Sequence, residues 1–271
     1  GGWLTDFFGW QSVFFSMLPF IFASIVLAPF KLKGEWQVEE PQPLDWKGVG
    51  LLCLWLLSLF VGVSNLPETY AIVLLLVSLV LVLLFMYHSR QVKFPVINLR
   101  LVWQNHKLSR SLLAAILMYG ASYGLQFLMG LYLQYNRGYS PMDAGQFLMI
   151  QAVIMALIAP IAGNFSDRYP PNKIAACGCL FVVLSYALML SLDDDSHMAV
   201  IVIAMVLLGA GFGLFSTPNS NAAMQSVATE KLGIVSALVS MSRLLGQLLS
   251  TAFVPLMMSL YIGQTEIDPS N

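Results

Sequence analysis

The chain has 271 residues, of which 58% are hydrophobic and only 10% are charged, and its mean hydropathy is +0.76. A soluble domain carries about a quarter charged residues, so this composition excludes a soluble globular protein and makes the lipid bilayer the solvent. The formal net charge of −1 does not indicate a nucleic-acid partner, and no basic sequence patch suggests one.

Eight apolar runs are long enough to cross a membrane, which takes about 20 residues of helix. An open sheet edge is not tolerated in hydrocarbon, so every run is predicted to be helical. The sequence therefore predicts an all-α polytopic membrane protein. The predicted spans are 11–30, 48–64, 70–87, 111–135, 144–162, 174–192, 198–217 and 234–260.

Basic residues are distributed unevenly between the two sides of these spans. One side has only Arg137, together with acidic residues such as Asp143 and Asp193. Cytoplasmic loops carry the excess of Lys and Arg, so the richer side is predicted to be cytoplasmic and both ends of the sequence to be external. That side carries Lys31, Lys33, Lys47, Arg90, Lys93, Arg100, Lys107, Arg110, Arg168, Lys173 and Lys231.

Two connections are longer than the others. Segment 31–47 is polar, contains Pro41 and Pro43, and is predicted to be a hydrated linker. Segment 88–110 mixes basic residues with apolar ones, which is typical of an amphipathic helix on the inner membrane surface. A plain connecting loop is the alternative for this second segment.

Cofactor and catalytic signatures are missing from the sequence. Cys177 and Cys179 would point about 200° apart on a helix, so they predict no metal site. The sequence has no glycine-rich nucleotide loop and no cluster of His, Asp, Glu or Ser typical of an active site. We therefore expect no cofactor, no metal and no enzymatic activity.

The hexapeptide Gly163-Asn164-Phe165-Ser166-Asp167-Arg168 separates two uncharged membrane-length runs. Gly163 at a helix end would permit a tight turn. Asp167 could cap a neighbouring helix N-terminus, where negative charge is favoured. An ordinary charged loop that obeys the positive-inside rule is the alternative interpretation.

In this setting the pattern Gly163-x-x-x-Asp167-Arg168-x-x-x-x-Lys173 resembles the cytoplasmic loop motif of the major facilitator superfamily. Pro170-Pro171-Asn172 stands where the family usually has Gly-Arg, so the turn departs from the family's pattern there. The resemblance implies that these four residues form a conformational motif and not a substrate site.

Two further stretches are similar to the drug/proton antiporters of that superfamily. Gly1 and Gly2 stand where the glycine-rich antiporter motif would end, although Gln11 replaces the family's usual Arg and Leu18 its usual Asn. The second stretch resembles the fourth and fifth helices of the C-terminal half, and its matching residues are Gly209, Gly211, Gly213, Pro218, Gly233, Ser236, Arg243 and Gly246.

Two extra helices within 48–87 are the mark of the fourteen-helix branch of these antiporters. The resemblance implies a major facilitator-type bundle in which 1–30 ends the N-terminal half, 31–47 is the linker and 88–110 the cytoplasmic segment. Residues 111–271 would form an incomplete C-terminal half. We expect the sequence to be a fragment that lacks the first helices and the last helix.

Arg243 is the one charge that we place deep in a span, where a charge costs about 2.5–3.5 kcal/mol on insertion scales. Its neighbours Ser242, Gly246 and Ser250 form a small-residue row suited to close helix packing. Arg243 is therefore expected to face the bundle or a wet cavity, as a counter-charge or gating residue. A snorkelling or carbonyl-bonded arginine is the alternative.

Tyr119, Tyr123 and Gln126 share one helix face at positions i, i+4 and i+7, and Gln151 could add a polar group from the next span. Aromatic rings with an amide suit a cavity for lipophilic or cationic compounds. Helix packing is the alternative explanation for these side chains.

The resemblance implies a secondary active transporter, in the bacterial inner membrane, that exports amphipathic drugs in exchange for protons. Its expected partners are a lipophilic or cationic small molecule, protons, the lipid bilayer and a periplasmic adaptor protein. Uptake of a nutrient or metabolite, and a non-transporting polytopic membrane protein, are the alternatives.

Overall fold

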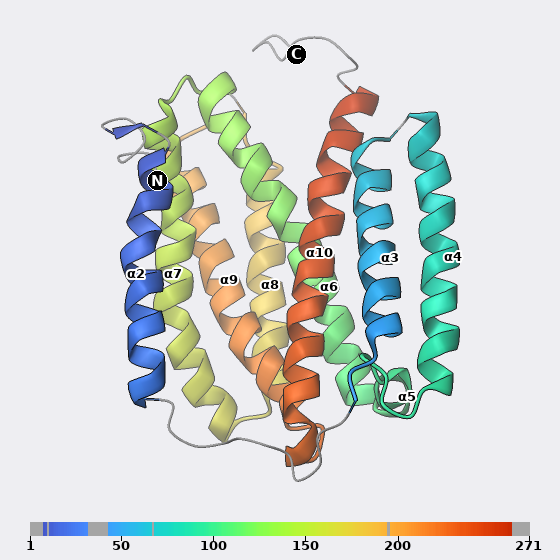
Figure 1. Ribbon diagram of the computed structural model, residues 1–271. Coiled ribbons are helices and arrows are strands. Elements are labelled where there is room, and N and C mark those ends of the chain that lie inside the picture. The colour runs from blue at the N-terminus through green and yellow to red at the C-terminus, as the bar shows by residue number, and fades with distance from the viewer. Residues whose placement is uncertain (1–7, 10, 32–42, 67, 194–195, 262–271) are drawn as a thin grey trace.

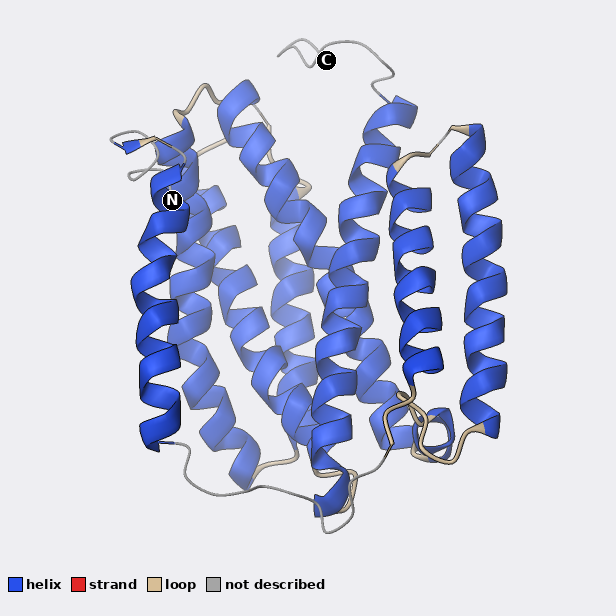
Figure 2. Cartoon of the chain, in the orientation of Figure 1, coloured by secondary structure: helices blue, strands red, loops and turns tan. Residues whose placement is uncertain are grey.

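The structure is a computed structural model, which describes residues 8–9, 11–31, 43–66, 68–193 and 196–261. It confirms the eight predicted spans as long helices, which stand roughly parallel in a bundle (Figures 1 and 2). They are α2 (Gln11–Lys31), α3 (Trp46–Ser64), α4 (Thr69–Gln91), α6 (His106–Leu131), α7 (Pro141–Arg168), α8 (Pro171–Met189), α9 (Met198–Met224) and α10 (Leu232–Tyr261).

Successive helices alternate in direction. Helices α3, α6, α8 and α10 start at the lower end in Figure 1, and α2, α4, α7 and α9 finish there. The described members of the basic set in the sequence lie at this end, which we call the basic end. The antiparallel order thus gathers these charges on one face of the membrane, as the positive-inside rule requires.

Helices α6 and α10 pack closely because glycines and serines meet at their crossing. A Cβ added to Gly246 would lie 2.5 Å from the carbonyl oxygen of Ile116 and 2.9 Å from the amide nitrogen of Gly120. One turn further along, the Gly124 N–H donates a hydrogen bond of 2.7 Å to Ser250 Oγ. The small-residue row predicted on α10 is therefore confirmed as a helix contact.

Helix α9 lies at the centre of the bundle, between α7 and α8. The three glycines Gly209, Gly211 and Gly213 are positions of close helix packing. A Cβ added to Gly209 would lie 2.5 Å from the Gln151 carbonyl oxygen, and a Cβ added to Gly211 would lie 2.8 Å from the Gly178 carbonyl oxygen. Alternate glycines point to opposite sides of a helix, so α9 approaches both neighbours closely.

Segment 88–110 is not the continuous amphipathic helix that its composition suggested. α4 extends to Gln91, a short helix α5 (Leu99–Gln104) follows, and α6 begins at His106. Two asparagines explain the interruptions: Asn98 accepts a 3.0 Å bond from the Leu101 N–H, and Asn105 accepts one of 3.1 Å from the Leu108 N–H. Each side chain caps a new helix start, so the chain turns there.

Helices α3 and α4 form an antiparallel pair, and α3 packs against α10. Asp45 joins the pair at the basic end, where its Oδ1 accepts bonds from the Gly48 N–H at 2.9 Å and from His88 Nε2 at 2.8 Å. Burial alone would raise the pKa of the Asp45 carboxyl, but these two donors and the His88 charge outweigh it and lower the pKa below 3.8. Asp45 therefore stays ionised at neutral pH as the N-cap of α3.

Candidate functional site

A cavity of about 230 Å³ lies among helices α6, α7, α9 and α10. It brings together Tyr119, Gln126 and Gln151, which the sequence singled out, whereas the side chain of Tyr123 lies outside the described part of the structure. Their contact with a substrate stays a prediction. The described residues lining the cavity are Tyr119, Ser122, Gln126, Gln151, Met155, Phe212 and Gln247.

The two glutamines of α6 and α7 bond to each other across the cavity. Gln126 Nε2 donates to Gln151 Oε1 at 2.9 Å. Gln151 is only 5% exposed, whereas Gln126 is an exposed residue. A buried amide needs hydrogen-bond partners, so this contact holds the Gln151 amide in place in the cavity wall.

Tyr119 connects the cavity to α9. Its hydroxyl lies 3.1 Å from Ser216 Oγ, and its ring meets the edge of Phe212 with the centroids 5.7 Å apart. The Arg243 guanidinium lies over the same ring, 5.6 Å from its centroid. The ring is therefore fixed by one hydrogen bond, one edge-to-face contact and one cation–π contact.

Arg243 of α10 points into the bundle. Its Nη2 donates to Ser220 Oγ at 2.8 Å, and its guanidinium covers Tyr119. Neither described contact is with a carboxylate or a backbone carbonyl, so among the described residues the arginine forms no ion pair and no bond to a carbonyl. Its role in transport stays a prediction.

Four cavity residues were missed in the sequence: Ser122, Met155, Phe212 and Gln247. Gln247 lies one turn after Arg243, and a polar side chain in an apolar run was a signal that could have found it. Ser122 accepts a 2.9 Å bond from the Tyr186 hydroxyl of α8, which ties α8 to the cavity wall. Met155 and Phe212 are two of many apolar residues, so only the folded structure shows that they line the cavity.

The conformational motif has a different local structure from the predicted turn. α7 continues to Arg168, so Gly163 lies inside the helix and the chain turns only at Tyr169 and Pro170. A Cβ added to Gly163 would contact Thr217 Cγ2 of α9 at 3.4 Å. Gly163 therefore lies where α7 contacts α9 and not in a tight turn.

Ser166 is a buried residue inside the motif. It was not among the predicted site residues. It is 2% exposed, donates to the Gly163 carbonyl at 2.8 Å and accepts a 2.6 Å bond from Asn221 Nδ2 of α9. A buried amide-to-hydroxyl bond fixes the register of the two helices. The end of α7 is therefore attached to α9.

The charged members of the motif point away from the described bundle. Asp167, Arg168 and Lys173 are exposed, and none has a side-chain hydrogen bond or ion pair with another described residue. The Lys173 N–H donates to the Pro170 carbonyl at 3.0 Å, where α8 starts. Gly1 and Gly2, the predicted end of an antiporter motif, lie outside the described residues.

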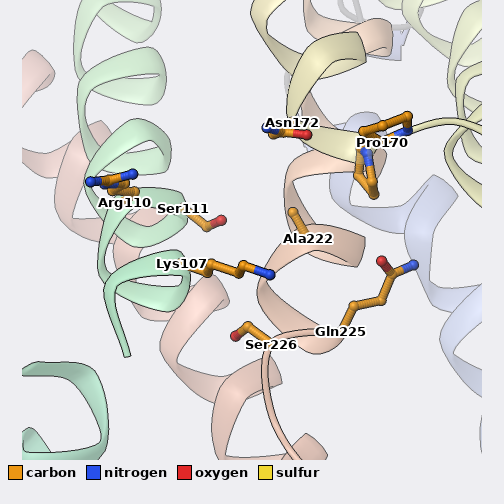
Figure 3. Close-up of a pocket in the computed structure, with 9 residues that line it drawn as sticks. Lys107, Arg110, Ser111, Pro170, Asn172, Ala222, Gln225 and Ser226 are labelled. Atoms are coloured by element: carbon orange, nitrogen blue, oxygen red, sulfur yellow. The ribbon is translucent and has the colours of Figure 1, made fainter. Parts of the chain in front are cut away.

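A larger hollow, of about 430 Å³, opens at the basic end between α6, α8 and α9 (Figure 3). Lys107 points into it toward α9, and Arg110 and Asn172 also line it. None of the predicted cavity residues lines this hollow. It adds charge to the basic end beside the α7–α8 connection and is separate from the candidate substrate cavity.

Known proteins with similar sequences show the family of this chain. A riboflavin transporter, RibZ of Clostridioides difficile, is 29% identical over 257 residues, which cover 93% of this chain and 55% of that protein. A multidrug resistance protein B homolog of Mycobacterium tuberculosis is 26% identical, over 98% of this chain and 51% of that protein. The drug efflux pump JefA of the same species is 24% identical, over 97% of this chain and 52% of that pump.

The chain spans about half the length of these curated relatives. The family model of the Major Facilitator Superfamily matches residues 1–251. The described residues of this chain form eight membrane-length helices, which make the chain part of an integral membrane protein. With nearly the whole chain matched, the protein belongs to the Major Facilitator Superfamily.

Proposed function

We propose that the full-length protein is a secondary active transporter that exports amphipathic small molecules in exchange for protons by alternating access. The observation that carries the proposal is the polar turn Ser216–Asn221 of α9, which bonds to Tyr119 of the cavity wall and to Ser166 inside the conformational motif. A shift of this turn would change its contacts at both places. Coupling between a substrate site and a gate requires such a shared element.

The polar turn has two faces. Ser216 and Ser220, four residues apart, contact Tyr119 and Arg243 on the cavity side. Thr217 and Asn221, also four residues apart, contact Gly163 and Ser166 on the α7 side. Residues at this spacing lie on one helix face, so the same helical turn bonds to α6, α7 and α10.

Pro218 lies in the middle of this turn. A proline within a helix removes one backbone hydrogen bond and favours bending. Asn219 next to it donates a 3.0 Å bond to the Ser111 carbonyl of α6, so the weakened point is held by side chains. Such a site can change its bend when the contacts on one face change, as a rocking transporter needs.

The direction of transport rests on the relatives. Two of those compared are named for drug resistance or drug efflux, which favours export. The riboflavin transporter supports a second candidate, the transport of a vitamin-like nutrient. Within the described spans, carboxylates occur only at helix ends, at Asp143 and Asp167. We therefore assign proton binding to no residue of the described spans.

The proposal includes an orientation and a location. The basic end faces the cytoplasm of a bacterial cell, and the protein lies in its inner membrane, where a periplasmic adaptor protein could receive the exported compound. The two extra helices of the fourteen-helix branch would be α3 and α4, which pack as a pair beside α10.

The test is proton flux in proteoliposomes that contain the full-length protein and an internal pH indicator. Addition of neutral and cationic amphipathic compounds is expected to release an imposed pH gradient in a substrate-dependent manner. Empty liposomes and liposomes with an unrelated membrane protein are the controls. No substrate-dependent flux with any compound of a broad panel would contradict proton-coupled export.

A further inference from the structure

We propose that the cavity prefers uncharged or anionic planar compounds with a lactam edge, an adjacent N–H and C=O, over cations. The inference rests on the proposed function and names its substrate class. It departs from the cationic substrates that the aromatic residues alone suggested, and it is carried by the glutamine pair and by the position of Arg243.

The glutamine pair presents a complementary hydrogen-bonding edge. One bond joins Gln126 and Gln151, and each amide has one carbonyl oxygen and one NH2 group. Gln126 donates and Gln151 accepts, so the Gln126 carbonyl oxygen and the Gln151 NH2 group have no other hydrogen bond to a described residue. A lactam carries one donor and one acceptor side by side, which can bond to this carbonyl oxygen and this NH2 group.

Arg243 makes the site unfavourable for a cation. An aromatic ring attracts cations through its face, but the guanidinium already lies over the Tyr119 ring, 5.6 Å from its centroid. A second positive charge there would be repelled. The described residues lining the cavity include no Asp or Glu that could compensate a buried cation.

The remaining walls suit a flat ring system. Phe212 and Met155 supply apolar surface, and Gln247 adds a third amide from α10. Phe212 is 5% exposed and held edge-on by Tyr119. A planar heteroaromatic compound can lie along these apolar walls while its polar edge meets the glutamines.

The experiment measures binding to the full-length protein in nanodiscs by fluorescence anisotropy, with three probes. Lumichrome is planar and uncharged and has ring N–H groups beside carbonyls, lumichrome methylated at both of these ring nitrogens lacks every N–H donor, and ethidium is a planar cation. Lumichrome is expected to bind at least about tenfold more tightly than its methylated form, and more tightly than ethidium.

Two cavity variants and one matched control test whether Gln151 causes these differences in affinity. Gln151→Leu is expected to abolish the difference between lumichrome and its methylated form, and Gln151→Glu to raise the affinity for ethidium by supplying the missing carboxylate. Gln146→Leu changes an exposed glutamine of the same helix outside the cavity and should leave every affinity unchanged.

Equal binding of lumichrome and its methylated form, tighter binding of ethidium, or no binding of lumichrome would each overturn the inference. Transport assays with the same probes separate it from the proposed function. Ethidium transport without lumichrome transport would overturn only the substrate class. Lumichrome binding without transport of any compound would leave the substrate class standing and contradict the transporter proposal.

Discussion

Gly246→Val is expected to prevent stable packing of α10 against α6 and to lower the free energy of unfolding by about 3 kcal/mol or more. The added Cβ alone would lie 2.5 Å from the Ile116 carbonyl oxygen, closer than real contacts allow. The neighbouring atoms are backbone, so no side-chain rotation relieves the clash. The two helices would have to separate, with loss of the Gly124–Ser250 bond.

The measurement is thermal unfolding of the purified protein in detergent, followed by intrinsic fluorescence. Gly233→Val, in the same helix, is the matched control because an added Cβ there meets nothing within 4 Å. It removes a glycine from a helix and should be neutral or slightly stabilising. A Gly246→Val protein as stable as the Gly233→Val protein would refute the close contact.

Asp167→Asn is expected to lower the transport rate about tenfold or more, in the range of typical coupling free energies, without lowering thermal stability. Asp167 is exposed at the basic end and makes no side-chain bond within the described residues, so its charge contributes little to this part of the fold. The resemblance of the motif implies that the carboxylate acts on the other half of the transporter during alternating access.

The rate is measured in proteoliposomes at matched protein content, alongside a melting curve. Asp143→Asn is the control, since it removes the same charge at the opposite end of the same helix, where Asp143 accepts a 2.7 Å bond from Ser140. Full transport in Asp167→Asn, or equal losses in both variants, would remove the assigned role of the motif.

The spans and their orientation could be predicted because they depend on properties of single segments. The length of an apolar run sets a helix, and the distribution of Lys and Arg sets its direction. The row Ser242, Gly246 and Ser250 was also visible, since its spacing defines a helix face without knowledge of the partner.

Features that depend on a partner helix were not predictable in the same way. Gly163 was expected to turn the chain, but α9 beside it makes the residue a contact point. Gln126 and Gln151 were each noted, but the bond between them follows from the positions of α6 and α7.

The most direct test asks whether the cavity opens to both sides of the membrane. A Met155→Cys variant of the full-length protein, with every native cysteine replaced by Ala, Cys53, Cys177 and Cys179 among them, carries one thiol in the cavity wall. A membrane-impermeant maleimide is applied to either face of oriented vesicles, with and without substrate. Labelling from both faces, in proportions that substrate changes, is the predicted result. Labelling from one face only under all conditions would contradict alternating access through this cavity.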